Sequence, residues 1–226
     1  MPEVDYSAGP KQFEKLQKLL SDQKNISVEI DAQLKQFEKL QSELSGQSKI
    51  SLEIDKQLPG KASRFQAVIK TRPELLGDTL IVTAKKIISS GKIPVMVLTA
   101  RNYRVMIQEL ENAGIETKKV VLVDCVTKNI FCEKDKENIF FADSLADLPG
   151  LEIKIIELVE AYSKAVFVFD SLDILRLFHS DENIFKFIHS ITKILRKNSV
   201  NAYYFFGSNY IVSKISQFFD YSVEIE

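Results

Sequence analysis

The pattern of hydrophobic and polar residues divides the chain into two parts with different periods. Between residues 11 and 58, apolar residues recur every three or four positions, as they do on one face of a helix. After residue 61, short apolar runs alternate with longer amphipathic stretches, which is typical of strands alternating with helices. Pro59 and Gly60 end the helical pattern. We therefore place a domain boundary there, with a helical arm at 1–60 and an α/β domain at 61–226.

The arm contains a tandem repeat of 24 residues. Residues 11–34 read KQFEKLQKLLSDQKNISVEIDAQL, and residues 35–58 read KQFEKLQSELSGQSKISLEIDKQL. Good helix formers dominate both units, and the apolar spacing of about 3.4 residues is close to that of a coiled coil. We expect residues 11–58 to associate as a coiled coil and make the chain a homo-oligomer.

Two alternatives for the arm stay open. Residues 26–30 and 50–54 alternate strictly between apolar and polar, and Ser45-Gly46 could interrupt a helix, which also fits a helical hairpin folded back on itself. The repeat could equally be a solvated spacer without a partner outside its own chain.

The second part predicts a mostly parallel sheet with helices on both faces. Apolar runs indicate strands at 65–69, 94–99, 119–125, 166–170 and 201–206, with an edge strand at 221–225. The stretches between them predict helices at 73–90, 102–114, 151–163, 172–197 and 209–219, the fourth interrupted near Ser180. Residues 130–131 and 139–141 flank a charged segment and indicate a small hairpin.

Asp170 and Ser171 follow the most apolar of these strands. Parallel α/β sheets bind ligands at the carboxyl ends of their strands, so Asp170 is a candidate ligand for Mg²⁺. A structural alternative is that Asp170 or Ser171 caps the helix that follows. Asp124 ends another strand, and a cation site shared by Asp124 and Asp170 would instead indicate an unrelated enzyme.

The element order of residues 62–226, the segment Phe167-Val168-Phe169-Asp170-Ser171-Leu172, and Asn102-Tyr103 at the start of a helix resemble the RecA-like core of KaiC-type ATPases. The archaeal single-domain members of that family are the most similar. The resemblance implies a RecA-like, P-loop-type fold in which Asp170 takes the Walker B position and holds Mg²⁺.

The phosphate-binding motif of that family is degraded here. The family's first strand leads into G-x-x-x-x-G-K-[ST], and in this chain Arg72, Gly77, Asp78 and Thr79 stand at its conserved places. Asp78 replaces the lysine, and a carboxylate repels a triphosphate. The family's acidic pair after the second strand is also missing, because residues 98–102 read LTARN.

The resemblance with these departures implies a pseudoenzyme, a non-catalytic ATPase relative that acts as a protein-interaction, scaffold or signalling module without a cofactor. An alternative is a protein that binds ATP and Mg²⁺ with little or no hydrolysis, through Gly77, Thr79, Asp170 and Ser171.

The composition adds few constraints. The net charge of −1 shows no basic excess for nucleic acid. Cys125 and Cys132 form no C-x-x-C and indicate reduced thiols. No apolar run approaches the length of a membrane span, and the first residues lack a signal-peptide pattern. We expect an archaeal-type cytoplasmic protein without a membrane span.

Overall fold

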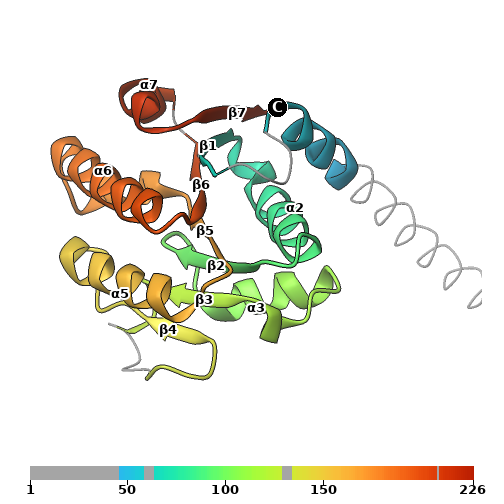
Figure 1. Ribbon diagram of the computed structural model, residues 1–226, viewed down its shortest axis with the longest axis horizontal. Helices are drawn as coiled ribbons and strands as arrows, with labels where there is room; N and C mark the ends of the chain where they lie inside the picture. Colours follow the sequence, from blue (N-terminus) through green and yellow to red (C-terminus); the bar gives the residue numbers. More distant parts are fainter. Residues whose placement is uncertain (1–45, 59–63, 129–133, 208) are drawn as a thin grey trace, which may run out of the picture. The chain divides into compact units, whose positions relative to one another are not determined.

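The structure, a computed structural model, describes residues 46–58, 64–128, 134–207 and 209–226 (Figure 1). Gln47–Glu226 form one compact unit. Residues 11–45, which carry most of the predicted coiled coil, lie outside the described residues, as does the first half of the predicted hairpin. Within the described residues, no helix is both long enough and apolar enough to span a bilayer.

The sheet has seven strands in the order β4-β3-β2-β5-β6-β1-β7, and every pair of neighbouring strands is parallel. The strands are β1 (Gln66–Thr71), β2 (Ile93–Leu98), β3 (Val121–Asp124), β4 (Ile139–Phe141), β5 (Ala165–Asp170), β6 (Asn201–Phe206) and β7 (Tyr221–Ile225). The predicted parallel α/β sheet flanked by helices is confirmed. β7 lies at an edge as expected. β4, the described half of the predicted hairpin, pairs in parallel with β3.

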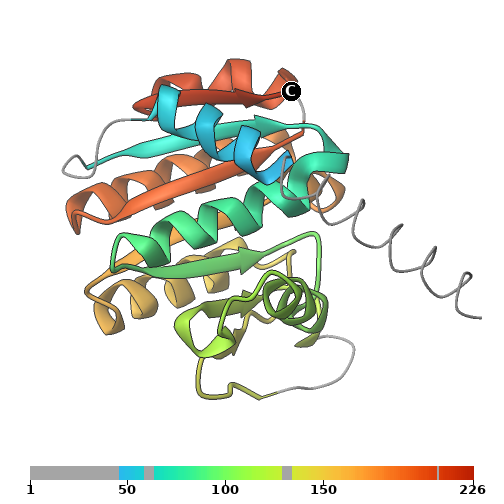
Figure 2. The same ribbon diagram turned by 90° about the vertical axis from the view of Figure 1, so that its right-hand side faces the viewer.

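Helices cover both faces of the sheet (Figures 1 and 2). The α-helices are α2 (Leu76–Ser89), α3 (Tyr103–Asn112), α5 (Leu148–Ala161), α6 (Asp181–Lys197) and α7 (Asn209–Ile215). Four 3-10 segments lie between them: η1 (Pro73–Leu75), η2 (Thr117–Lys119), η3 (Leu172–Leu177) and η4 (Ser216–Phe218).

Two hydrophobic cores lie on opposite faces of the sheet, because successive side chains of a strand point to opposite sides. Phe167 and Phe169 of β5 pack with α5, α6 and α7, whereas Val166 and Val168 pack with α2 and α3. Strands β5 and β6 are buried along their whole length, which explains their continuous apolar sequences.

Local signals in the sequence set several helix ends. Asn102 caps α3, where its side chain accepts hydrogen bonds from the backbone N–H groups of Arg104 and Val105. Ser180 caps α6 in the same way through Asn183. Gly91 and Gly114 follow α2 and α3 with φ values of 75° and 72°, which favour glycine.

Residues 46–57 form a further helix that packs on the α/β unit. Ile50 and Ile54 are 5% and 1% exposed and belong to the core formed with α2 and α3. The compact unit therefore includes residues 47–58, whereas the sequence placed the boundary at Pro59-Gly60. These two isoleucines belong to the apolar face expected to join copies of the chain, and here their own chain covers them.

Candidate functional site at the carboxyl edge of the sheet

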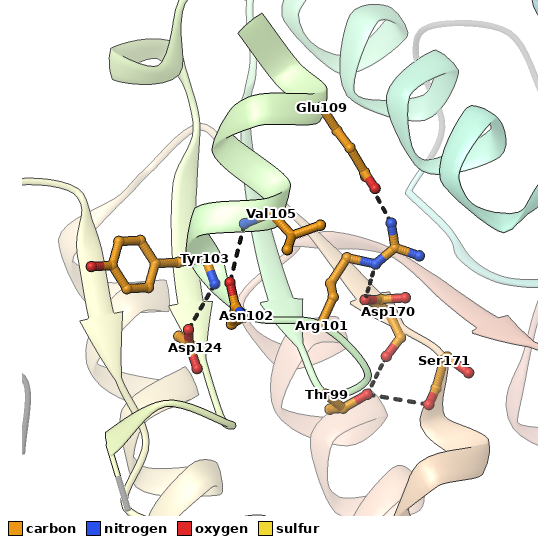
Figure 3. A network of polar contacts seen from close by, with 9 residues as sticks. All are labelled: Thr99, Arg101, Asn102, Tyr103, Val105, Glu109, Asp124, Asp170 and Ser171. Carbon is orange, nitrogen blue, oxygen red and sulfur yellow. Dashed lines mark hydrogen bonds and ion pairs between the residues drawn. The ribbon is translucent and has the colours of Figure 1, made fainter. Parts of the chain in front are cut away.

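The chain leaves β2 and β5 toward opposite faces of the sheet. β2 is followed by α3 on one face, and β5 is followed by η3 and α6 on the other. In open α/β sheets, a crevice forms at the carboxyl ends of neighbouring strands whose connections diverge in this way, and ligands bind there. The segments that follow β2 and β5 therefore form the candidate site (Figure 3).

Asp170 lies at the end of β5 and is fully buried. Its Oδ2 atom is 3.0 Å from Nε of Arg101. Neither carboxylate oxygen has a hydrogen-bond partner among the described residues, so the contact with Arg101 is an ion pair with poor hydrogen-bond alignment. Burial raises the pKa of Asp170 from 3.8 to about 6, although the Arg101 charge acts in the opposite direction.

Arg101 connects three elements of the structure. Besides its ion pair with Asp170, its Nη1 atom donates to Oε2 of Glu109 on α3 at 2.7 Å (Figure 3). A Cβ placed on Gly77 of α2 would lie 3.8 Å from the same Nη1 atom. The guanidinium thus lies beside Gly77, against the carboxylate expected to bind Mg²⁺.

Thr99 and Ser171 join the backbones of the two loops. The Thr99 hydroxyl donates to the carbonyl oxygens of Asp170 and Ser171, the latter at 3.2 Å. Ser171 has φ 45° and ψ 68°, a left-handed conformation that is costly for a residue other than glycine. Its side chain makes no capping hydrogen bond to η3. Since the Asp170 carboxylate accepts none either, the expectation that one of them caps the following helix is wrong.

Asp124 takes part in a separate network. Its carboxylate accepts hydrogen bonds from the backbone N–H groups of Tyr103, Val126 and Thr127, each at 2.7 Å, and from the Thr127 hydroxyl at 2.6 Å. It thereby ties the start of α3 to the loop after β3.

The structure does not bring Asp124 and Asp170 together. Leu98 of β2 pairs with both residues, so one strand separates them and their backbones are about 10 Å apart. No cluster of three or more His, Cys, Asp or Glu residues suited to a metal ion occurs within the described ranges.

The other predicted nucleotide-binding residues lie at the start of α2. Thr79 is buried, and its hydroxyl donates to the Leu75 carbonyl at 2.7 Å within the helix. Asp78, at the place of the lysine, accepts a hydrogen bond from Gln47 at 3.2 Å. Ser171 instead lines an open surface pocket of about 500 Å³ with Pro73, Asp173, Arg176 and Gly207.

In the sequence, Arg101 stands out only because the family's acidic pair is missing from its segment, and no pattern points to Thr99 or Glu109. Arg101 and Glu109 are eight residues apart, beyond the three or four residues at which a helix brings side chains together. The contact with Asp170 depends on β2 and β5 being neighbours, which local sequence patterns do not reveal.

These features define the protein as a parallel α/β domain in which an internal ion pair bridges the crevice between β2 and β5. The chain belongs to a family of unknown function, DUF7504, whose model matches residues 91–225, more than half of its length. That range includes Thr99, Arg101, Asp124 and Asp170.

Solved structures with a similar fold come from Pyrococcus horikoshii. One is the uncharacterized protein PH0321 in complex with an unknown peptide, with a TM-score of 0.59 and 12% identity over 77% of this chain and 82% of that one. Another is the KaiC-like protein PH0186, with a TM-score of 0.46 and 15% identity over 66% of this chain and 67% of that one. The likeness to PH0321 shows the fold alone. No curated protein matches the chain.

Proposed function

We propose that the chain is a degenerate RecA-like domain of the KaiC type that has lost ATP hydrolysis and acts as a protein-interaction, scaffold or signalling module. The proposal combines the parallel sheet, the position of Asp170 at the end of β5, and the residues that replace the ATPase motifs. It includes homo-oligomer formation through residues 11–58 and a cytoplasmic location, for which two reduced thiols are typical.

The observation that carries the proposal is the Arg101 guanidinium 3.0 Å from the Asp170 carboxylate. A magnesium ion bound by Asp170 would lie within a few ångströms of a fixed positive charge in a buried region, where like charges repel strongly. In ATPases of this type the segment after the second strand supplies carboxylates, whereas here it supplies a cation that neutralises Asp170.

The residues at the start of α2 support the same conclusion. Asp78 would face a triphosphate with a negative charge, and the Thr79 hydroxyl donates within its own helix. Pro73 also removes one backbone N–H from the loop that would cradle phosphate. The alternative of ATP binding through Gly77, Thr79, Asp170 and Ser171 gains no support from these contacts.

The test measures phosphate release and the melting temperature of the full chain with and without Mg²⁺ and ATP. We expect no phosphate release above background and no shift of the melting temperature. A ligand that did bind, at 100 times its Kd, would stabilise the fold by about 2.7 kcal/mol. Arg101→Ala should gain a Mg²⁺-dependent shift, and Lys118→Ala, which removes an exposed cation elsewhere, should not. Turnover that disappears in Asp170→Asn would refute the proposal.

A further inference from the structure

The helix of residues 46–57 binds one side of α2 through a defined set of side chains (Figures 1 and 2). Gln47 donates to Asp78 and accepts from Lys85, both at 3.2 Å. Asp55 pairs with Lys86 at 2.6 Å. Between these polar ends, the side chains of Ile50 and Ile54 are buried in the core, and Leu58 packs at its edge. We call the side of α2 that carries Asp78, Lys85 and Lys86, together with the apolar core beside it, the α2 surface.

Every residue that makes these contacts has an identical counterpart in the first repeat. Gln47, Ile50, Ile54, Asp55 and Leu58 correspond, 24 positions earlier, to Gln23, Ile26, Ile30, Asp31 and Leu34. The docking side chains are therefore present twice in the chain, whereas the structure describes one α2 surface.

The positions at which the repeats differ avoid the docking face. When residues 47–58 are aligned with residues 23–34, the two segments differ only at positions 48, 49, 52 and 56 of the second repeat. All four are exposed in the second repeat. The seven positions that are buried or half-buried there are all identical, and so is Asp55, which is exposed but pairs with Lys86. The first repeat has thus kept the side chains needed for docking and has varied where docking imposes no requirement.

We propose that residues 23–34 are a second docking segment, and that they bind the α2 surface of a second copy of the chain. The surface specifies its ligand by chemistry: two buried isoleucines one helical turn apart, a glutamine that bridges Asp78 and Lys85, and an aspartate for Lys86. The partner copy's own residues 47–58 compete for that surface with the advantage of a tether. Binding between chains therefore occurs by exchange with that segment.

This inference rests on the proposed interaction role and names its contact. Its test measures docking, with no readout of turnover or Mg²⁺, so either proposal can fail alone.

The experiment mixes two full-length chains that both carry Cys132→Ser. In the receptor, Ile26, Ile30, Ile50 and Ile54 are changed to Glu, so that neither of its segments docks, and Lys86→Cys provides a probe. The donor carries Asp31→Cys and is otherwise intact. A short bis-maleimide should link donor to receptor several-fold more than when the donor carries Ala32→Cys, the counterpart of the exposed Lys56. A single chain with Asp55→Cys and Lys86→Cys serves as the positive control.

Equal linking by both donors, or none by either, would overturn the proposal. A single chain that carries both Asp31→Cys and Lys86→Cys is measured alongside. If residues 31 and 86 link only within that chain and never between donor and receptor, the proposal is also overturned, because the first repeat would then replace the second in its own chain. Should the receptor fail to fold by far-UV circular dichroism, the same crosslink is measured between Asp31→Cys and Lys86→Cys chains that keep both segments, where exchange alone must give the product.

Discussion

Replacing Asp170 by Asn tests whether the buried carboxylate is held at a cost to stability. The carboxylate is fully buried, its only described partner is Arg101, and its pKa is about 6 instead of 3.8. Because the pKa is raised despite the nearby guanidinium, the desolvation cost exceeds the gain from the ion pair. Asp170→Asn keeps the shape of the side chain and removes its charge, so it should not destabilise the fold at neutral pH.

The magnitude follows from the two pKa values. Each pKa unit corresponds to about 1.4 kcal/mol, so an ionised Asp170 costs the folded state about 3 kcal/mol above pH 6. Between pH 3.8 and about 6 the folded protein binds more protons than the unfolded chain, and stability therefore falls as pH rises through that window. The Asn variant lacks this contribution, and its advantage should grow by about 1.5 kcal/mol between pH 5 and pH 8.

The assay is urea unfolding of both full-length proteins from pH 5 to pH 8. Far-UV circular dichroism is the suitable signal because the chain contains no tryptophan. Asp143→Asn, which changes an exposed carboxylate, is the matched control and should show no such trend. The reasoning fails if the difference in unfolding free energy between Asp170→Asn and wild type is independent of pH. It also fails if the unfolding free energy of Asp170→Asn is more than about 2 kcal/mol below that of wild type at pH 7.

Two further predictions concern Asp124 and the N-terminal repeat. Asp124→Ala should lower the free energy of unfolding in urea by about 3 kcal/mol or more, since three backbone N–H groups and a hydroxyl lose their acceptor. Asp124→Asn should lower it less. A change near zero for Asp124→Ala would contradict this role. The full chain should sediment as an oligomer, because burying the apolar stripe of residues 11–45 outweighs a typical association cost. Leu16→Glu with Leu40→Glu should return it to monomer without unfolding the α/β unit, and a monomeric wild type would disprove self-association.

Part of the fold could be read from the sequence because its signals act over a few residues. β6 and β7 begin and end at the predicted residues, since a mostly apolar run defines β6 locally and alternation of apolar and polar residues defines β7. Asn102 predicted the start of α3, because a capping side chain reaches only two or three residues ahead. The interruption predicted near Ser180 corresponds to the break between η3 and α6. The alternation of strands and helices then limited the fold to a parallel sheet with covered faces.

The site depended on contacts that the sequence does not encode locally. Arg101 meets Asp170 only because β2 lies beside β5, an adjacency set by the order of strands across the whole sheet. Likewise, the apolar period of the second repeat predicted a buried face, but the period does not name the covering partner. The tertiary structure decided that the α/β unit of the same chain covers Ile50 and Ile54, because its core on this face accepts both side chains and α2 supplies the charged partners of that segment.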